Sequence, residues 1–165
     1  MIGHDALLDQ LAAQWSAGGR SVGGGMALNQ LREFEALHSV QWPEDFRRYL
    51  LFVNGMGPGR PHATDRRGFF FWPMTQMRSA YDELSAICAP GREEPAEALK
   101  DYLAFADHLH WSWAYALNVS NRGPSNGAVL KIDGPLRFEK VTDNFSEFLR
   151  IYLEDSPLLY KRVES

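Results

Sequence analysis

The sequence predicts an α+β domain, with helices first, strands in the middle and a helix at the end. Up to about residue 84, apolar residues recur three and four positions apart, which is the spacing of one helix face. Between residues 102 and 141 the spacing changes to two, and the apolar runs have the length of strands. Short turns separate these runs, so we expect an antiparallel meander. Helical spacing returns at residues 144–153.

The amino-acid composition limits the class of protein. Of the 165 residues, 45% are hydrophobic and 13% are aromatic, which suits one globular domain with a core rich in rings. There are 17 Lys and Arg against 21 Asp and Glu, and no basic run, so we expect no direct binding of nucleic acid. Cys88 is the single cysteine, which excludes an internal disulfide and favours a reducing compartment. Without a signal peptide or a membrane-spanning apolar run, we predict a cytoplasmic protein with no membrane contact.

Two helices are predicted near the N-terminus, joined by a glycine-rich connection. The first covers residues 4–16, and its apolar face carries Leu7, Leu8, Leu11 and Trp15. Residues 17–25 contain five glycines but lack the Lys and Ser or Thr that a phosphate-binding loop needs, so a linker is the better interpretation. The second helix runs from Ala27 to His38. Its core-facing residues are expected to be Leu28, Leu31, Phe34 and either Leu37 or His38.

The third predicted helix, within Trp42–Gly59, has the clearest start and stop signals in the sequence. Pro43 suits the first helical position, and its apolar stripe consists of Phe46, Tyr49, Leu50 and Val53. Asn54 and Gly55 end it, because both residue types enter the left-handed conformation easily. The Gly55–Gly68 loop that follows is polar and locally basic, so we expect it to be exposed.

The middle of the chain combines a strand, a helix and an acidic segment. Phe69–Trp72 is predicted to be a strand covered on both faces. Pro73 is expected to open a helix whose apolar edge carries Met74, Met77, Tyr81 and Leu84. Residues 93–101 form the most acidic segment, which is either a solvated helix start or a docking patch.

Four further strands and a closing helix are predicted after residue 101. The strands are expected at Tyr102–Ala106, 111–119, Ala128–Asp133 and Leu136–Val141. Along residues 111–119 large rings alternate with small residues, so the small-residue face is either covered by a helix or forms the floor of a cleft. Asn144 caps the last helix, which is expected to end before Pro157, because proline disrupts a helix. Its apolar face carries Phe145, Phe148, Leu149, Tyr152 and Leu153.

The search for reactive groups gives no catalytic motif. Asp107, His108 and His110 could share a metal or a proton, but a third metal ligand would have to come from His4, His38 or His62, and a polar turn explains the cluster equally well. No serine lies in a nucleophile elbow, and Cys88 has no basic neighbour before Arg92. We therefore predict no catalytic residue, no cofactor and no metal, and expect that the protein is not an enzyme.

The ordered residues resemble the SUKH superfamily, to which the fungal Smi/Knr cell-wall regulators belong. The resemblance covers about residues 27–160 and includes a helix that ends in Asn-Gly and a late Phe-rich helix. One departure is Trp42, where the family usually has Leu before Pro. The residues that carry the resemblance are Glu33, Glu35, Trp42-Pro43, Phe46, Tyr49-Leu50, Asn54-Gly55, Leu103–Asp107, Gly127–Ile132, Phe145, Phe148-Leu149 and Tyr152-Leu153.

The resemblance implies a mixed, largely antiparallel sheet packed against N-terminal, middle and C-terminal helices, and no catalysis. Bacterial members of the superfamily are mostly immunity proteins, which bind and silence a cognate toxin, often a nuclease, in the producing cell. The acidic chain is compatible with a basic nuclease as partner. We expect an N-terminal helix and connection at residues 1–26, one SUKH-like domain at residues 27–160 and a tail at residues 161–165.

Two exposed, charged segments are the predicted partner-binding surface. The residues are Arg60, His62, Arg66 and Arg67 in the basic loop, and Glu93, Glu94, Glu97 and Asp101 in the acidic segment. One alternative is an intracellular regulatory scaffold of the Smi/Knr type. Another is a small-molecule binder or small enzyme that uses the sheet face near Ala114 and Ala116.

Overall fold

The structure, a computed structural model, describes residues 3–20, 24–57, 64–122 and 125–164. The described helices are α1 (His4–Ala17), α2 (Leu28–His38), α3 (Glu44–Phe52), α4 (Ala80–Ile87) and α5 (Phe145–Leu153). Three short 3₁₀ helices are η1 (Met74–Gln76), η2 (Glu97–Asp101) and η3 (Pro157–Leu159). The strands are β1 (Phe69–Phe71), β2 (Tyr102–His108), β3 (Trp113–Asn118), β4 (Val129–Gly134) and β5 (Arg137–Thr142).

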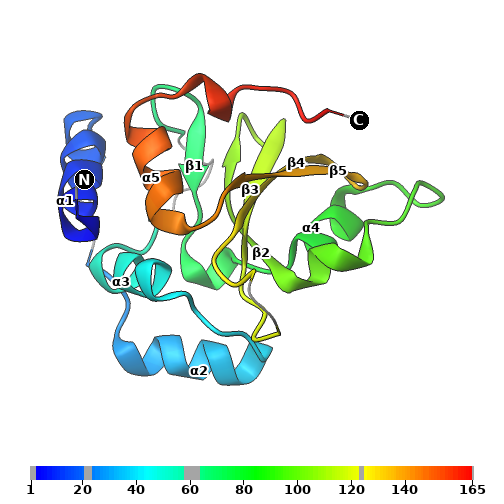
Figure 1. Cartoon of the computed structure of the whole chain (residues 1–165), viewed down its shortest axis with the longest axis horizontal. Helices are drawn as coiled ribbons and strands as arrows, with labels where there is room; N and C mark the ends of the chain where they lie inside the picture. The colour runs from blue at the N-terminus through cyan, green and yellow to red at the C-terminus, as the bar shows by residue number, and fades with distance from the viewer. Residues whose placement is uncertain (1–2, 21–23, 58–63, 123–124, 165) are drawn as a thin grey trace.

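The five described strands form one sheet in the order β1-β2-β3-β4-β5, and neighbouring strands are antiparallel. Helices α1, α3 and α5 lie on one side of the sheet, and α4 lies on the other (Figure 1). The predicted α+β class is therefore confirmed, but the described strands form a purely antiparallel sheet and not the mixed sheet that was expected. Because antiparallel partners point the same way, Ala114 shares a face with Asp107 and Ile132, whereas Tyr115 shares the opposite face with Lys131.

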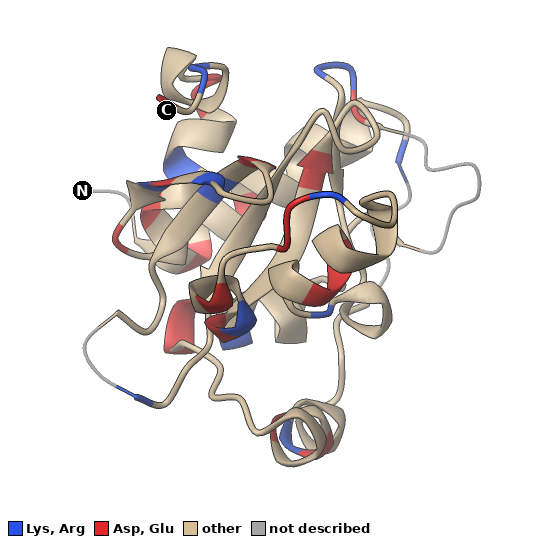
Figure 2. Ribbon diagram, turned by 90° about the vertical axis from the view of Figure 1, so that its right-hand side faces the viewer, with Lys and Arg blue, Asp and Glu red and all other residues tan. Residues whose placement is uncertain are grey.

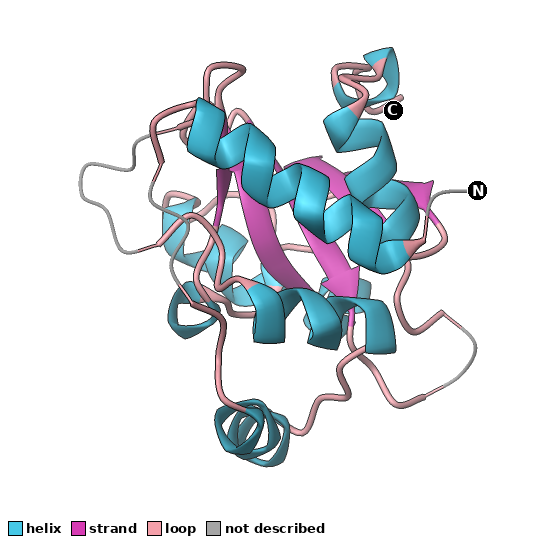
Figure 3. Ribbon diagram, turned by 90° about the vertical axis from the view of Figure 1, so that its left-hand side faces the viewer, coloured by secondary structure: helices cyan, strands magenta, loops and turns pink. Residues whose placement is uncertain are grey.

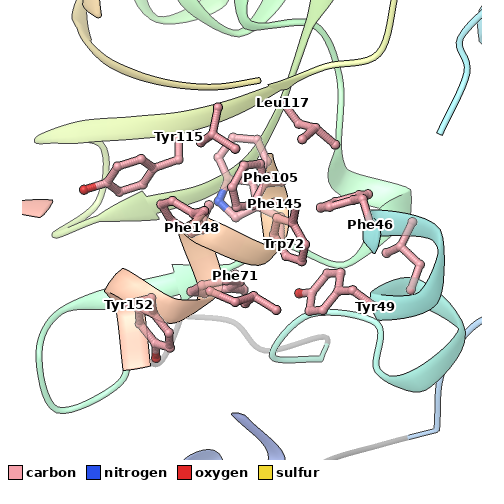
Figure 4. Packing of buried hydrophobic residues seen from close by; sticks show 14 of the residues in the cluster. Phe46, Tyr49, Phe71, Trp72, Phe105, Tyr115, Leu117, Phe145, Phe148 and Tyr152 are labelled. Carbon is pink, nitrogen blue, oxygen red and sulfur yellow. The ribbon is translucent and has the colours of Figure 1, made fainter. Parts of the chain in front are cut away.

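The face that carries Tyr115, called here the α5 face, holds the main core. Phe105 from β2 meets Phe145 and Phe148 from α5 at ring centroid distances of 5.5 and 5.2 Å, and Phe46 from α3 lies 4.7 Å from Phe145 (Figure 4). These rings are completely buried. Edge-to-face contacts of this kind add to the area that the rings bury, so the predicted stripes of α3 and α5 form one interlocking layer.

Helix α1 completes the helical layer on the α5 face (Figure 3). Its predicted apolar face is buried, and Trp15 reaches α5, where its Nε1–H donates to the Tyr152 hydroxyl at 3.0 Å. The Tyr152 hydroxyl in turn donates to Asp65 Oδ2. These two bonds connect α1, α5 and the segment before β1.

The segment after α5 is also attached to the α5 face. The Tyr115 hydroxyl donates to the carbonyl of Leu159 at 2.8 Å, and the Lys131 ammonium donates to the carbonyls of Leu159 and Lys161. Lys131 Nζ lies 4.3 Å from the centre of the Trp113 ring, and burial lowers the pKa of Lys131. Leu159 is completely buried, so the chain end closes this side of the core.

The opposite face, called here the α4 face, has a smaller core. Ala116 is covered, because it packs in a cluster with residues of α4 and η2, so the small-residue face lies under a helix and is not the floor of a cleft. The cluster consists of Ala80, Leu84, Leu99, Ala116, Leu130 and Ile132.

Two predictions about helices were wrong in detail. In α2 only Leu31 is buried, whereas Leu28 and Leu37 are 42% and 79% exposed. The reason is that α2 lies at the bottom rim of the molecule (Figure 1), where Trp42 Nε1–H bonds the carbonyl of Leu31. The second error concerns Pro73, which was expected to open a helix but precedes only the 3₁₀ turn η1.

The middle helix, α4, begins at Ala80 and not after Pro73. Ser79 forms an isolated antiparallel bridge with Leu103, and Ala104 N donates to the carbonyl of Arg78, so the chain before α4 is held extended along the sheet. The Ser79 hydroxyl then caps the helix by accepting from Asp82 N.

Helix α3 ends at Phe52, before the predicted stop at Asn54 and Gly55, and Val53 is already extended. Gly55 has φ 61°, and a Cβ there would lie 2.5 Å from the carbonyl oxygen of Trp72. Both the left-handed backbone and the close approach of β1 therefore require glycine. Asn54 adds a specific contact, because its Oδ1 accepts from Met74 N at 2.7 Å.

Candidate functional site

The turn between β2 and β3 has an unusual backbone. Leu109, His110 and Trp111 have φ values of 46°, 52° and 70°, so three consecutive non-glycine residues are left-handed. Each such residue costs roughly 1–3 kcal/mol, and strain of this kind is concentrated at functional sites. The turn is held by Leu109 N–H to the carbonyl of Gly68 (2.9 Å) and by Trp111 N–H to Asp107 Oδ1 (3.3 Å).

Trp111 lies between two hollows on the α4 face and lines both. The first, called here the Trp72 hollow, has a volume of about 530 Å³ and lies between β2 and the chain leading into α4. The second, called here the Cys88 hollow, has a volume of about 690 Å³ and lies between α4 and the β4–β5 turn. Volumes of this size are typical of binding sites.

The Trp72 hollow combines aromatic walls with carboxylates. The rings of Trp72 and Trp111 are 6.1 Å apart between centroids, at an interplanar angle of 58°. Trp72 Nε1–H donates to Asp107 Oδ2 at 2.7 Å, which fixes the carboxylate and the indole relative to each other. Glu83 of α4, which is 7% exposed, accepts from Arg78 Nε.

The Cys88 hollow is more apolar. Its wall includes Ile87, which is 54% exposed, and Cys88, which is half-buried. Asp133 lines it as well and pairs with Arg137 at 3.1 Å. Ile87 beside the half-buried Trp111 is therefore a candidate contact for a partner protein.

The predicted acidic segment lies on this side of the molecule. Glu93, Glu94, Glu97 and Asp101 are all exposed, and Glu93 lines the Cys88 hollow. The segment is attached to the sheet by Ala96 N–H, which donates to the carbonyl of Pro135 at 3.0 Å. Figure 2 faces this side and shows carboxylate-bearing stretches on α4, on the connection after it and on η2.

The predicted basic loop lies elsewhere. Arg60 and His62 are outside the described residues, and Arg66 is exposed. The Arg67 guanidinium donates through one nitrogen to the carbonyl of Tyr152 (2.8 Å) and to Asp155 (2.9 Å). It also lies 4.5 Å from the centre of the Tyr152 ring, on the α5 side. The structure therefore does not bring Arg67 together with the acidic segment.

Comparison with known families identifies the fold. Residues 25–151 match the SMI1 / KNR4 family (SUKH-1). The chain belongs to this family. The matched range contains the whole sheet, α4, the strained turn and both hollows, whereas α1 and the segment after α5 lie outside it. No curated protein matched the chain.

In this SUKH-1 protein the polar residues at the end of β2 do not form a joint site. Asp107 points to the α4 face, whereas His108 lies on the α5 face, stacked on Trp113 at 4.0 Å with its Nε2 2.8 Å from the carbonyl oxygen of Arg67. Burial lowers the pKa of His108. His110 lines the Trp72 hollow. Among the described residues, which exclude His62, no group of three or more His, Cys, Asp or Glu could hold a metal ion.

The strained turn was missed in the sequence, although it leaves a signal there. The stretch His108–Trp113 (HLHWSW) separates two strands and contains no Gly, Asn or Pro. Tight connections usually contain these residues, because the left-handed conformation is least costly for Gly and Asn. Their absence from so short a connection indicates either that the two strands are wrongly predicted or that the turn between them is strained. None of the described helices of this SUKH-1 chain has the length and apolar character of a transmembrane segment.

Proposed function

We propose that this SUKH-1 protein is a non-enzymatic immunity protein that binds a cognate bacterial toxin in the cytoplasm of the producing cell and blocks it by occlusion. The observation that carries the proposal is the position of Trp111, which is held in a strained turn between two hollows on the α4 face. Tryptophan in a partly buried, central position is enriched among residues that dominate protein–protein binding.

The polar groups around Trp111 favour binding over catalysis. Asp107 is fixed by Trp72, Glu83 by Arg78 and Asp133 by Arg137. Groups held in this way present a defined shape and charge to a partner. The nearby exposed carboxylates suit a basic toxin, such as a nuclease, because complementary charge accelerates association.

The structure gives less support to the two alternative functions, a small-molecule binder and a regulatory scaffold. The small-molecule site near Ala114 and Ala116 has no open floor, because both residues are completely buried. A regulatory scaffold of the Smi/Knr type would also use an exposed surface, and the genomic neighbourhood distinguishes it from an immunity protein. An immunity gene is expected beside the gene of its toxin.

The test is co-expression with the protein encoded beside this chain. We expect that protein alone to arrest growth, the pair to restore it, and the two chains to purify as a stoichiometric complex. Trp111→Ala and Ile87→Ala should weaken the complex, whereas Leu37→Ala, which removes a 79% exposed leucine on α2, should not. A neighbour without toxicity, or a toxicity that the chain does not relieve, would reject the immunity function.

The acidic segment is tested separately by charge reversal. Replacement of Glu93, Glu94, Glu97 and Asp101 by Lys should slow association with the toxin, most strongly at low salt. The matched control reverses four carboxylates outside this segment: Asp9, Glu33, Glu44 and Glu154, all exposed. If both variants slow association equally, the effect is one of net charge, and the acidic segment is not part of the interface.

A further inference from the structure

Asp107 is a nearly buried carboxylate that has no cationic partner in the described part of the chain. It is 5% exposed, and its two hydrogen bonds come from the neutral donors Trp72 Nε1–H and Trp111 N–H. No Lys, Arg or His side chain among the described residues lies within ion-pair distance of it. A buried carboxylate without a counter-charge is costly, which makes the adjoining hollow favourable for a cation.

A second carboxylate in the same hollow has spare acceptor capacity. Glu83 is 7% exposed and accepts from Arg78 through Oε1, while Oε2 has no hydrogen-bond partner among the described residues. The Arg78 side chain is 59% exposed and pairs with Glu83 through Nε, so it offsets the charge of one of the two carboxylates. A carboxylate offers about four acceptor positions, and Asp107 uses two. The hollow therefore has acceptors for a further donor and an excess of negative charge.

The walls of the hollow suit the stem of a long side chain. Trp72 and Trp111 stand at 58° to each other, and Met77 lines the same space. Indole faces attract ammonium and guanidinium groups, and they also pack against methylene groups. Aromatic walls beside buried carboxylates are complementary to a side chain that is apolar along its length and cationic at its tip.

We propose that the Trp72 hollow receives one arginine or lysine side chain of the partner protein, with its charged head at Asp107 and its stem packed against the exposed face of Trp111. This proposal rests on the proposed function for the nature of the partner. It specifies the chemistry of one contact: the toxin presents a basic anchor residue. The aromatic walls of the hollow, which pack against methylene groups, favour a protein side chain over a free small cation.

The test uses small probes, so that it does not depend on the toxin. N-acetyl-arginine amide is titrated into the full chain, and the indole N–H signals are followed by NMR. Saturable shifts are expected for Trp72 and Trp111, but not for Trp15 and Trp42, whose indole N–H groups bond inside the protein. N-acetyl-citrulline amide, which has nearly the same shape without the charge, should bind at least about tenfold more weakly.

Variants locate the contact. Asp107→Asn should weaken arginine-amide binding by about tenfold or more. Glu83→Gln leaves the bond between Trp72 and Asp107 intact and should also weaken arginine-amide binding. This variant provides the test if Asp107→Asn does not fold. Asp143→Asn, an exposed carboxylate paired with Lys140, is the control and should change nothing.

Four results would overturn the proposal. These are no saturable shift, equal binding of the citrulline probe, unchanged affinity in both carboxylate variants, and guanidinium ion binding as tightly as arginine amide, which would mean a small-cation site. Arginine binding without a complex between the chain and its encoded neighbour would instead reject the immunity function and leave this site standing.

Discussion

The two faces of the sheet differ in how completely they are covered. On the α5 face, three helices and the chain end close over completely buried rings, and polar groups such as Tyr152 and Lys131 bond main-chain or side-chain partners. On the α4 face, one helix of eight residues leaves two hollows beside a strained turn. The α5 side also has a hollow of about 530 Å³, but it lies at the outer edge of the helical layer, between α1, residues 64–67 and the end of α5. The comparison indicates that stability comes mainly from the first face, and that the second is available for binding.

The largest expected effect comes from the closed face. Phe148 is completely buried and contacts Phe105 and Tyr115 at 5.2 and 4.9 Å. Phe148→Ala should lower the free energy of unfolding by about 3–5 kcal/mol, because it removes buried area and leaves a cavity. Chemical denaturation measures this. Trp111→Ala, on the half-buried open side, should cost clearly less, and an equal cost would contradict the division between the two faces.

A smaller effect is expected at the connection between α1 and α5. Tyr152→Phe removes a hydroxyl that accepts from Trp15 Nε1 and donates to Asp65, so both groups lose a partner. We expect a loss of about 1–3 kcal/mol. Tyr160→Phe, at a hydroxyl that donates to the exposed Asp155, is the matched control and should cost less. Equal thermal shifts for the two variants would show that the buried connection adds no stability.

The strained turn gives an expected change of opposite sign. His110 has φ 52°, so His110→Gly should raise the free energy of unfolding by about 1 kcal/mol while weakening partner binding. Ser112→Gly is the control in the same connection. Ser112 does not have a positive φ, so glycine there should lower stability. If His110→Gly destabilises the protein, the turn does not store the strain that its backbone indicates.

The smallest expected effect is a pH dependence on the closed face. Burial lowers the pKa of His108 in the folded state, and among the described residues Nδ1 has no hydrogen-bond partner to accept a proton from it. Below the unfolded pKa of about 6.5, the unfolded chain therefore binds more protons, and stability falls as the pH decreases. His108→Gln should reduce the difference between unfolding free energies at pH 7.5 and pH 5. An unchanged difference would contradict the assignment.

Much of the fold could be predicted because its signals are local. Asn144 and Glu147 mark the start of α5, and the stripe of α3 depends on spacing alone. The site could be predicted only in part. The exposure of the acidic segment follows from composition, but its position beside the Cys88 hollow depends on the bond between Ala96 and Pro135, which are distant in sequence.

The errors arose where distant contacts decide the local structure. Ser79 is held extended by Leu103, which delays the start of α4. Arg67 lies in a polar, basic segment that was expected to be exposed, yet its guanidinium donates to the carbonyl of Tyr152, 85 residues away. Trp111 alternates with Trp113 as a strand residue would, but its bond to Asp107 and its left-handed backbone place it in a turn.

Hydrogen–deuterium exchange of the complex with the neighbouring gene's product tests the central claim most directly. We expect the toxin to slow exchange in residues 87–94 and 107–113, around the two hollows, and to leave α1 and residues 157–164 unchanged. Slower exchange confined to α1, α5 and the chain end, with none around Trp111, would contradict the assignment of the α4 face as the binding surface.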